Sequence, residues 1–161
     1  MRHITVDIGH IDQLADEIKS AADWMERKQN ELAQRLAEIG VENARIGFNS
    51  AMYDGTSYSE VYCEQIGPGR YKVRAEGNAV LFIEFGAGLI GTGHPEPGIY
   101  GPGTYPGKGH WDDPHGWWYY DEDGAVHHTY GNPPAMPMYN AAKTLEQEIG
   151  RIAQEVFSRN D

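Results

Sequence analysis

The amino-acid sequence predicts an α+β fold for a single domain of 161 residues (1–161). Three observations support this fold class. Apolar residues recur every seven positions near the N-terminus, alternate with polar residues in the middle, and recur every three or four positions near the C-terminus. We therefore expect a long N-terminal helix, an antiparallel sheet of about four strands and a C-terminal helix packed on the sheet. A long Gly/Pro/aromatic loop insertion is expected at about residues 89–127.

The first predicted element is a long helix within residues 1–52. Its apolar residues are seven apart, and charged residues such as Asp16 and Glu26 lie between them. We interpret this stripe as the face that packs on the core of the domain, with a coiled-coil contact to another subunit as the alternative. Gly40 is expected to kink the helix or to separate a second short helix from it. The stripe consists of Ile11, Leu14, Ile18, Ala21, Met25, Leu32 and Ile39.

The middle of the chain predicts antiparallel strands. Apolar and polar residues alternate over residues 58–76 on both sides of Gly67-Pro68-Gly69, a pattern typical of a hairpin. After a further turn, the continuous apolar run at 79–85 predicts a buried third strand. Cys63 lies on the apolar side of the hairpin, so we interpret it as a small buried hydrophobic residue rather than a nucleophile.

The last predicted element is a helix of roughly twenty residues that begins near residue 138. Pro133, Pro134 and Pro137 hold the approach to it extended. Charged residues cover one side of this helix, and the apolar stripe on the other side should pack on the sheet. The stripe consists of Met138, Ala142, Leu145, Ile149, Ile152 and Val156.

Residues 86–137 differ in composition from the rest of the chain. They hold twelve of the twenty glycines, eight of the nine prolines and five of the seven histidines, and six acidic residues against one cation, Lys108. Trp117-Trp118-Tyr119-Tyr120 and the turn Asp123-Gly124 predict a further hairpin. Aromatic clusters of this kind stack on sugars or anchor protein interfaces. We favour contact with a neighbouring subunit.

Charge and composition exclude several classes of protein. The chain has 13 basic and 24 acidic residues, so its formal charge of −11 has the wrong sign for gripping the phosphates of DNA or RNA. Its apolar runs are too short to span a bilayer, and its single cysteine cannot form an intrachain disulfide. A soluble protein without a cofactor is expected.

A metal site is the alternative interpretation of the histidines. Imidazole and carboxylate groups bind zinc well, so a metal-dependent hydrolase or metal-binding protein is the second hypothesis. Against it, the spacing shows no helical His-x-x-x-His pair. Gly86, Gly88 and Gly91 have the spacing of a dinucleotide-binding loop, but the residues that follow cannot form the required helix. The candidate ligands are His94, His110, Asp112, His115, His127 and His128, with Asp113 beside them.

Two motifs resemble a family of tailed-bacteriophage morphogenesis proteins, called tail-component, tail-completion or head–tail joining proteins. The first is Phe82-Ile83-Glu84-Phe85-Gly86-Ala87-Gly88, similar to a strand in that family that ends in Glu-Phe-Gly-Thr/Ala-Gly. The second is the Pro/Met/aromatic stretch at 128–142, similar to the approach to the family's terminal helix. The order of elements also matches, so the resemblance covers nearly the whole chain. The turn at 53–57 lacks the family's proline, and the loop at 89–127 is long for the family.

The resemblance implies a structural virion protein of the neck or tail, assembled in the host bacterial cytoplasm, and not an enzyme. It would form a ring of copies of itself, with six expected, against head-completion, tail-terminator or tail-tube proteins. Genome DNA would pass nearby without being gripped, which an acidic lumen favours. No membrane and no cofactor are implied. The expected interface residues are Glu84, Phe85, Gly86, Trp117, Trp118, Tyr130, Pro134, Met136 and Met138.

Overall fold

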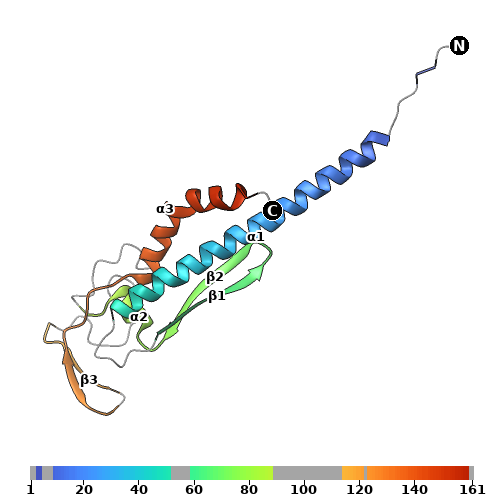
Figure 1. Cartoon of the computed structure of the whole chain (residues 1–161). Coiled ribbons are helices and arrows are strands. Elements are labelled where there is room, and N and C mark those ends of the chain that lie inside the picture. The colour runs from blue at the N-terminus through green and yellow to red at the C-terminus, as the bar shows by residue number, and fades with distance from the viewer. Residues whose placement is uncertain (1–2, 5–8, 52–58, 89–113, 122, 160–161) are drawn as a thin grey trace.

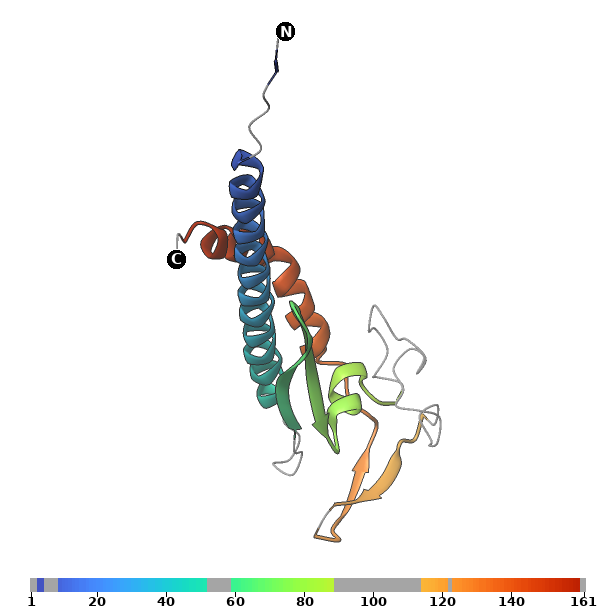
Figure 2. The same cartoon turned by 90° about the vertical axis from the view of Figure 1, so that its right-hand side faces the viewer.

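The computed structural model describes residues 3–4, 9–51, 59–88, 114–121 and 123–159. They form an elongated α+β molecule, with the first helix projecting at one end and a hairpin at the other (Figure 1, Figure 2). In this part of the chain, no helix is long and apolar enough to cross a membrane. The elements are α1 (Gly9–Ser50), β1 (Ser59–Gly67), β2 (Arg70–Gly77), α2 (Val80–Phe85), β3 (Trp117–Tyr120), β4 (Val126–Thr129) and α3 (Pro137–Phe157).

Helix α1 continues through Gly40, so the interruption expected there is wrong. A Cβ atom at Gly40 would lie 3.2 Å from Leu145 Cδ1 on α3 and 3.3 Å from Val73 Cγ2 on β2. Both distances are shorter than an ordinary van der Waals contact, so the absence of a side chain lets three elements approach one another closely. This packing offsets the roughly 1 kcal/mol by which glycine disfavours a helix interior.

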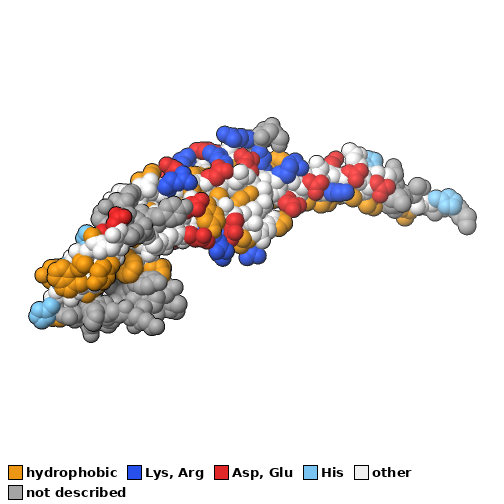
Figure 3. Space-filling model, turned by 90° about the horizontal axis from the view of Figure 1, so that it is seen from below, with side chains coloured by type: hydrophobic (Ala, Val, Ile, Leu, Met, Phe, Trp, Pro, Cys, Tyr) orange, Lys and Arg blue, Asp and Glu red, His pale blue; other side chains and the backbone are white. Residues whose placement is uncertain are grey.

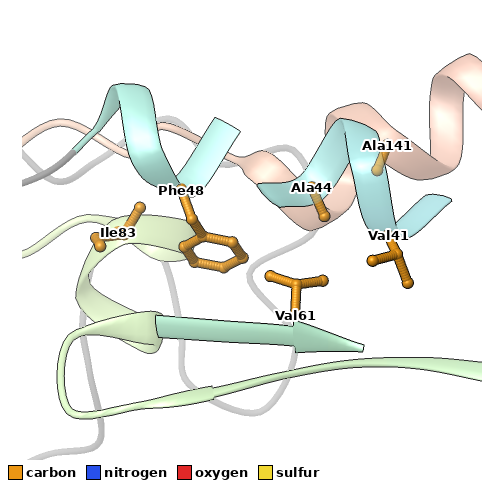
Figure 4. Packing of buried hydrophobic residues seen from close by; sticks show 6 residues of the cluster. All are labelled: Val41, Ala44, Phe48, Val61, Ile83 and Ala141. Atoms are coloured by element: carbon orange, nitrogen blue, oxygen red, sulfur yellow. The ribbon is translucent and has the colours of Figure 1, made fainter. Parts of the chain in front are cut away.

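The core lies where the C-terminal half of α1 meets β1, α2 and α3 (Figure 4). The Phe48 and Ala44 side chains of α1 are fully buried, and Ile83 reaches them from α2. Burying a Phe-sized or Ile-sized side chain stabilises a fold by about 1.5–3 kcal/mol. The central cluster consists of Val41, Ala44, Phe48, Val61, Ile83 and Ala141.

The predicted hairpin at residues 58–76 is confirmed as β1–β2. Val61 lies opposite Ala75 and Cys63 opposite Val73 in the antiparallel register, and these residues face the core. Cys63 is half-buried there, as expected of a small hydrophobic residue.

Residues 80–85 form the short helix α2, and the predicted third strand is wrong. A run of about six apolar residues does not separate a buried strand from a buried helix, because both have this length and composition. The described residues consequently form two separate two-stranded sheets, β1–β2 and β3–β4, in place of one sheet of four strands.

The C-terminal helix α3 is present as predicted, but it packs mainly along α1 rather than on the strands. Ile152 and Val156 are fully buried. Towards the end of α3, Phe157 makes an edge contact with Trp24, with ring centroids 5.9 Å apart. This aromatic pair marks the point on α1 beyond which α3 no longer covers the helix.

The N-terminal part of α1 projects from the folded body, and we call residues 9–25 the arm. Every residue from 9 to 23 is exposed. Figure 3 shows hydrophobic side chains along one edge of the projecting helix and acidic side chains along the other. The interpretation of the heptad stripe as core-facing is therefore wrong for its first half, whose large residues Ile11, Leu14, Ile18 and Met25 are 51% to 62% exposed.

Candidate functional site

Residues 82–88 and 130–139, from the two motifs singled out in the sequence, meet in space at the base of the loop insertion. Ala87 and Asn132 exchange two backbone hydrogen bonds of 2.9 Å. The Ala135 N–H donates to the Ile83 carbonyl oxygen at 2.8 Å, and the Asn132 side-chain amide donates to the Phe82 carbonyl oxygen at 2.8 Å. We call this contact between residues 82–88 and 130–139 the loop base. It joins the two ends of the segment that contains β3 and β4.

Glu84 connects the loop base to α3. Its buried carboxylate accepts hydrogen bonds from the backbone N–H groups of Met138 (2.8 Å) and Tyr139 (3.0 Å). These groups lie in the first turn of α3, where an N–H has no partner within the helix. The negative charge also interacts favourably with the helix dipole. A residue more than fifty positions earlier in the chain therefore caps α3.

Glycine is required where the two backbones of the loop base cross. Gly88 has φ +67° and Gly131 has φ +96°, conformations that L side chains rarely adopt. A Cβ at Gly131 would lie 1.9 Å from the Ala87 carbonyl oxygen, and one at Gly88 would lie 2.6 Å from the Tyr130 carbonyl oxygen. Gly88, which belongs to the motif with the spacing of a dinucleotide-binding loop, thus serves the close packing of two backbone segments.

Met136, at the start of α3, has a left-handed backbone conformation with φ 57° and ψ 42°. Among the described residues it is the only one besides glycine with positive φ. A long side chain disfavours this conformation, which persists where the surrounding structure holds it. The hydrogen bonds of Ala135 and Glu84 lie on either side of Met136 and fix the turn into the helix.

The β3–β4 hairpin presents an exposed face rich in aromatic rings, which we call the aromatic face. Trp118 pairs with His128 across the strands, and Tyr120 pairs with Val126. Trp118 and Tyr120 are 68% and 75% exposed. The centroids of Trp118 and His128 are 4.7 Å apart, and those of His128 and Tyr130 are 4.9 Å apart. The aromatic face consists of Trp118, Tyr120, Val126, His128 and Tyr130.

The opposite face of this hairpin is more buried, and its side chains stabilise the hairpin. Tyr119 stacks on His127 with centroids 5.4 Å apart. Asp121 accepts hydrogen bonds from His127 Nε2 (2.7 Å) and from the Ala125 N–H (2.8 Å). The bond from His127, followed by that from Ala125, lowers the pKa of the Asp121 carboxyl from its ordinary value. The hairpin turn is thus stabilised by an ionised carboxylate.

The expected interface residues divide into two groups. Trp118 and Tyr130 are exposed on the aromatic face. The other seven are buried or half-buried: Glu84, Gly86 and Met136 build the loop base, Met138 packs against the core, and Trp117 lies close to Gly88. Phe85 ends α2, and Pro134 lies in the approach to α3. Only two of the nine expected interface residues are therefore exposed.

Sequence reasoning missed the capping role of Glu84 and the outward direction of Tyr120, Val126 and His128. One signal could have indicated the cap: the chain before α3 offers no Ser, Thr or Asp at the usual capping position, so the first turn needs an acceptor from elsewhere. The alternation of residues 117–120 and 126–129 could have separated the two faces of the hairpin.

The histidines that the structure describes do not converge. His127 and His128 are adjacent on β4 and point to opposite faces of the hairpin, so they cannot share one ion in this conformation. His128 Nε2 lies 2.9 Å from the His115 carbonyl oxygen and must donate to it. In the described part of the chain, no group of three His, Cys, Asp or Glu side chains could hold a metal. His94, His110, Asp112 and Asp113 lie outside the described residues.

The geometry of the aromatic face favours a protein partner over a flat ligand. The rings of Trp118 and His128 are tilted by 59°, and those of His128 and Tyr130 by 84°, so the three rings do not form one stacking platform. Exposed Trp and Tyr side chains are the types that most often dominate the binding energy of protein interfaces. Asp121 and Asp123 at the tip disfavour a phosphate-bearing ligand.

The chain matches no protein-family model, no curated protein and no solved structure.

Proposed function

We propose that this protein is a structural, non-enzymatic component of a tailed-phage particle that joins head to tail or completes the tail as a ring of identical subunits. The observation that carries the proposal is the loop base. The two motifs that resemble the family bind each other and fix α3, and between them they hold out a hairpin with an exposed aromatic face. In this proposal, the residues of the loop base hold the hairpin so that its aromatic face can serve as a contact surface.

In this proposal, the aromatic face contacts the neighbouring subunit. A closed ring needs two different surfaces on each subunit, because each copy meets the next in a head-to-tail manner. The aromatic face supplies one such surface, with two large aromatic anchors, Trp118 and Tyr120. The expected neighbours along the particle axis are head-completion, tail-terminator or tail-tube proteins, and six subunits is the expected number.

The acidic composition is compatible with genome passage through such a ring. The formal charge of −11 repels a phosphate backbone, so DNA could pass without being trapped. The DNA would be a neighbour of the ring and not a bound ligand.

The proposal is tested by deleting the gene from the phage or prophage that encodes it and imaging the lysate. Tailed, infectious particles formed in normal numbers without the gene would contradict the structural role. Complementation then tests the surface. The double variant Trp118→Ser/Tyr120→Ser should fail to restore joined particles, while Ile149→Ser, a change at an exposed residue of α3, should restore them.

A further inference from the structure

We propose that the turn between β1 and β2 is the second surface of the subunit contact, and that it binds the aromatic face of a neighbouring copy. The inference rests on the proposed function, because it names the partner of the aromatic face within a ring of identical subunits. We call residues 66–72, which contain this turn, the basic turn. It presents one apolar and two cationic side chains, all exposed: Ile66, Arg70 and Lys72.

The two cations of the basic turn have no acidic partner. Most Lys and Arg side chains in the described part of the chain form an ion pair. Arg70 and Lys72 form none with a described residue. Glu64 lies across the strands from Lys72, but its carboxylate binds Arg74 at 2.6 Å. Arg70 and Lys72 are two positions apart on β2, so they leave the same face of the strand as neighbouring unpaired charges.

A bulge exposes Ile66 beside these cations. The register of β1–β2 shifts between Gln65 and Gly67, so Ile66 has no partner across the strands. Bulges redirect a side chain out of the regular alternation of a strand. The Ile66 side chain is 50% exposed. The basic turn therefore combines an apolar group with two positive charges.

Helix α1 fixes the conformation of the basic turn. The Asn30 side-chain oxygen accepts hydrogen bonds from the Gly69 N–H at 3.1 Å and from Gln65 Nε2 at 2.9 Å. A Cβ at Gly69 would lie 3.2 Å from the Gln29 side chain, so the turn packs directly on the helix. A surface that is already ordered loses little conformational freedom when a partner binds. The basic turn is thus preorganised for a contact.

The aromatic face complements the basic turn in charge and in chemistry. Lys and Arg side chains bind favourably over Trp and Tyr rings, and Trp118 and Tyr120 are largely exposed. Asp123 is exposed at the tip of the same hairpin, and the described residues between 114 and 136 include no Lys or Arg. The apolar part of the face offers contact for Ile66. An acidic, aromatic hairpin therefore meets a cationic, apolar turn.

The two surfaces lie in different parts of the molecule, so one copy can use both at once. The turn of β1–β2 lies beside the middle of α1, and the β3–β4 hairpin lies beyond the other end of the strands (Figure 1, Figure 2). A contact between two different surfaces repeats from copy to copy and forms a ring when the rotation closes. Each single contact is small, so we expect a dissociation constant on the order of 0.1–1 mM for one pair, with ring closure adding stability.

Two variants that each lack one surface test the contact in the full-length protein. The turn variant, Arg70→Glu/Lys72→Glu, retains the aromatic face. The face variant, Trp118→Ser/Tyr120→Ser, retains the basic turn. Each alone should stay monomeric. Mixed at about 0.5 mM each, they should form a one-to-one pair, because each supplies the surface that the other lacks.

NMR of the mixture locates the contact and reports the folding of each variant. When the face variant carries the nitrogen-15 label, its amide signals should shift at residues 65–72. When the turn variant carries the label, the shifts should lie in β3 and β4. The labelled face variant mixed with unlabelled face variant should show neither change. Absence of shifts in the mixed pair, or shifts elsewhere, would overturn the contact with a second copy and leave the aromatic face to a different protein.

A matched charge control separates the basic turn from general attraction. Lys19 and Arg27 are the other described cations without an ion pair, and they lie eight residues apart on α1. Adding Arg70→Glu/Lys72→Glu to the face variant should weaken its pairing with the turn variant at least about tenfold. Adding Lys19→Glu/Arg27→Glu, with the same change in net charge, should weaken it less than about twofold. Equal effects would overturn the assignment of the basic turn.

The gene deletion described above tests the particle role separately from this contact. Defective particles in the deletion strain, without pairing of the two variants, would overturn the contact and leave the proposed function in place. Pairing of the variants, with normal particles in the deletion strain, would contradict the proposed function and leave the contact between copies.

Discussion

The β1–β2 and β3–β4 hairpins are both antiparallel, but β1–β2 buries its apolar face whereas β3–β4 exposes its aromatic face. In β1–β2, the face with Val61 and Cys63 packs on α1 and joins the core. The outer face is polar, with an Arg74–Glu64 ion pair of 2.6 Å and a Tyr62–Glu76 hydrogen bond of 2.6 Å. In β3–β4, Trp118 is exposed instead.

The β1–β2 hairpin is therefore part of the hydrophobic core, whereas the β3–β4 hairpin is held at the surface by the rest of the molecule. Core burial orders β1–β2, because its apolar residues leave water when the chain folds. Hydrogen bonds at the loop base and at the Asp121 turn order β3–β4, so its aromatic face remains available. An exposed aromatic cluster of this kind indicates a contact surface.

The largest expected effect is on the core beneath β1–β2. Phe48→Ala should lower the free energy of unfolding by about 3–5 kcal/mol, because the fully buried ring leaves a cavity. Urea denaturation followed by circular dichroism measures this change. Ile46→Ala, at an exposed position of the same helix, serves as the control and should cost less than about 1 kcal/mol. Similar losses for the two variants would contradict the assignment of Phe48 to the core.

The next effect is on the loop base. Glu84→Ala should cost about 2–3 kcal/mol, because the Met138 and Tyr139 N–H groups lose a charged acceptor in a buried position. Hydrogen exchange should show faster exchange in the first turn of α3 and in β3–β4, with little change in β1–β2. Glu146→Ala, an exposed change on α3, should leave both patterns unchanged. Uniformly faster exchange would refute a local role for Glu84.

The same substitution in the two hairpins compares them directly. Val61→Ala in β1 should cost about 1–2.5 kcal/mol, whereas Val126→Ala in β4 should cost less than about 0.5 kcal/mol. The reason is that Val61 is 4% exposed and Val126 is 52% exposed. Thermal unfolding of both variants under the same conditions measures the two losses in the free energy of unfolding. Equal costs would remove the distinction between the hairpins.

The smallest effect concerns the pH response of the β3–β4 turn. The folded pKa of Asp121 lies below its ordinary value of 3.8. Its hydrogen bonds therefore stabilise the turn fully above that value, and this stabilisation is lost as the pH falls through the lower folded pKa. Carbon NMR titration of the Asp121 carboxyl should give a value below 3.8. Asp121→Asn should abolish the acid-dependent loosening of the turn, and a titration at or above 3.8 would contradict the turn geometry.

Sequence periodicity predicted the elements whose apolar residues repeat over a sufficient length. Heptad spacing identified α1, alternation around Gly67-Pro68-Gly69 identified β1–β2, and three-four spacing identified α3. The aromatic hairpin was also predicted, from the run Trp117-Trp118-Tyr119-Tyr120 and the Asp123-Gly124 turn. The residue patterns that indicate these elements are local, so a single sequence is enough to predict them.

The errors arose where distant contacts decide local structure. The run at 79–85 becomes a helix, because Ile83 and Glu84 bind residues some fifty positions later. Gly40 remains helical because Leu145 and Val73 occupy the space that a side chain would need. The residues of the candidate site were predicted from the sequence. Their division into a buried loop base and an exposed aromatic face could not be predicted, because it depends on the contact between residues 82–88 and 130–139.

The continuity of α1 means that the arm and the core move as one lever. The segment between Gly9 and Trp24 extends about 22 Å beyond the aromatic contact that anchors it, so a 10° rotation of the body displaces the tip by about 4 Å. Gly40 lies within the folded body, close to Leu145 and Val73, and is therefore not a joint between the body and the arm. Any tilt of the folded body is therefore transmitted along α1 to the tip of the arm.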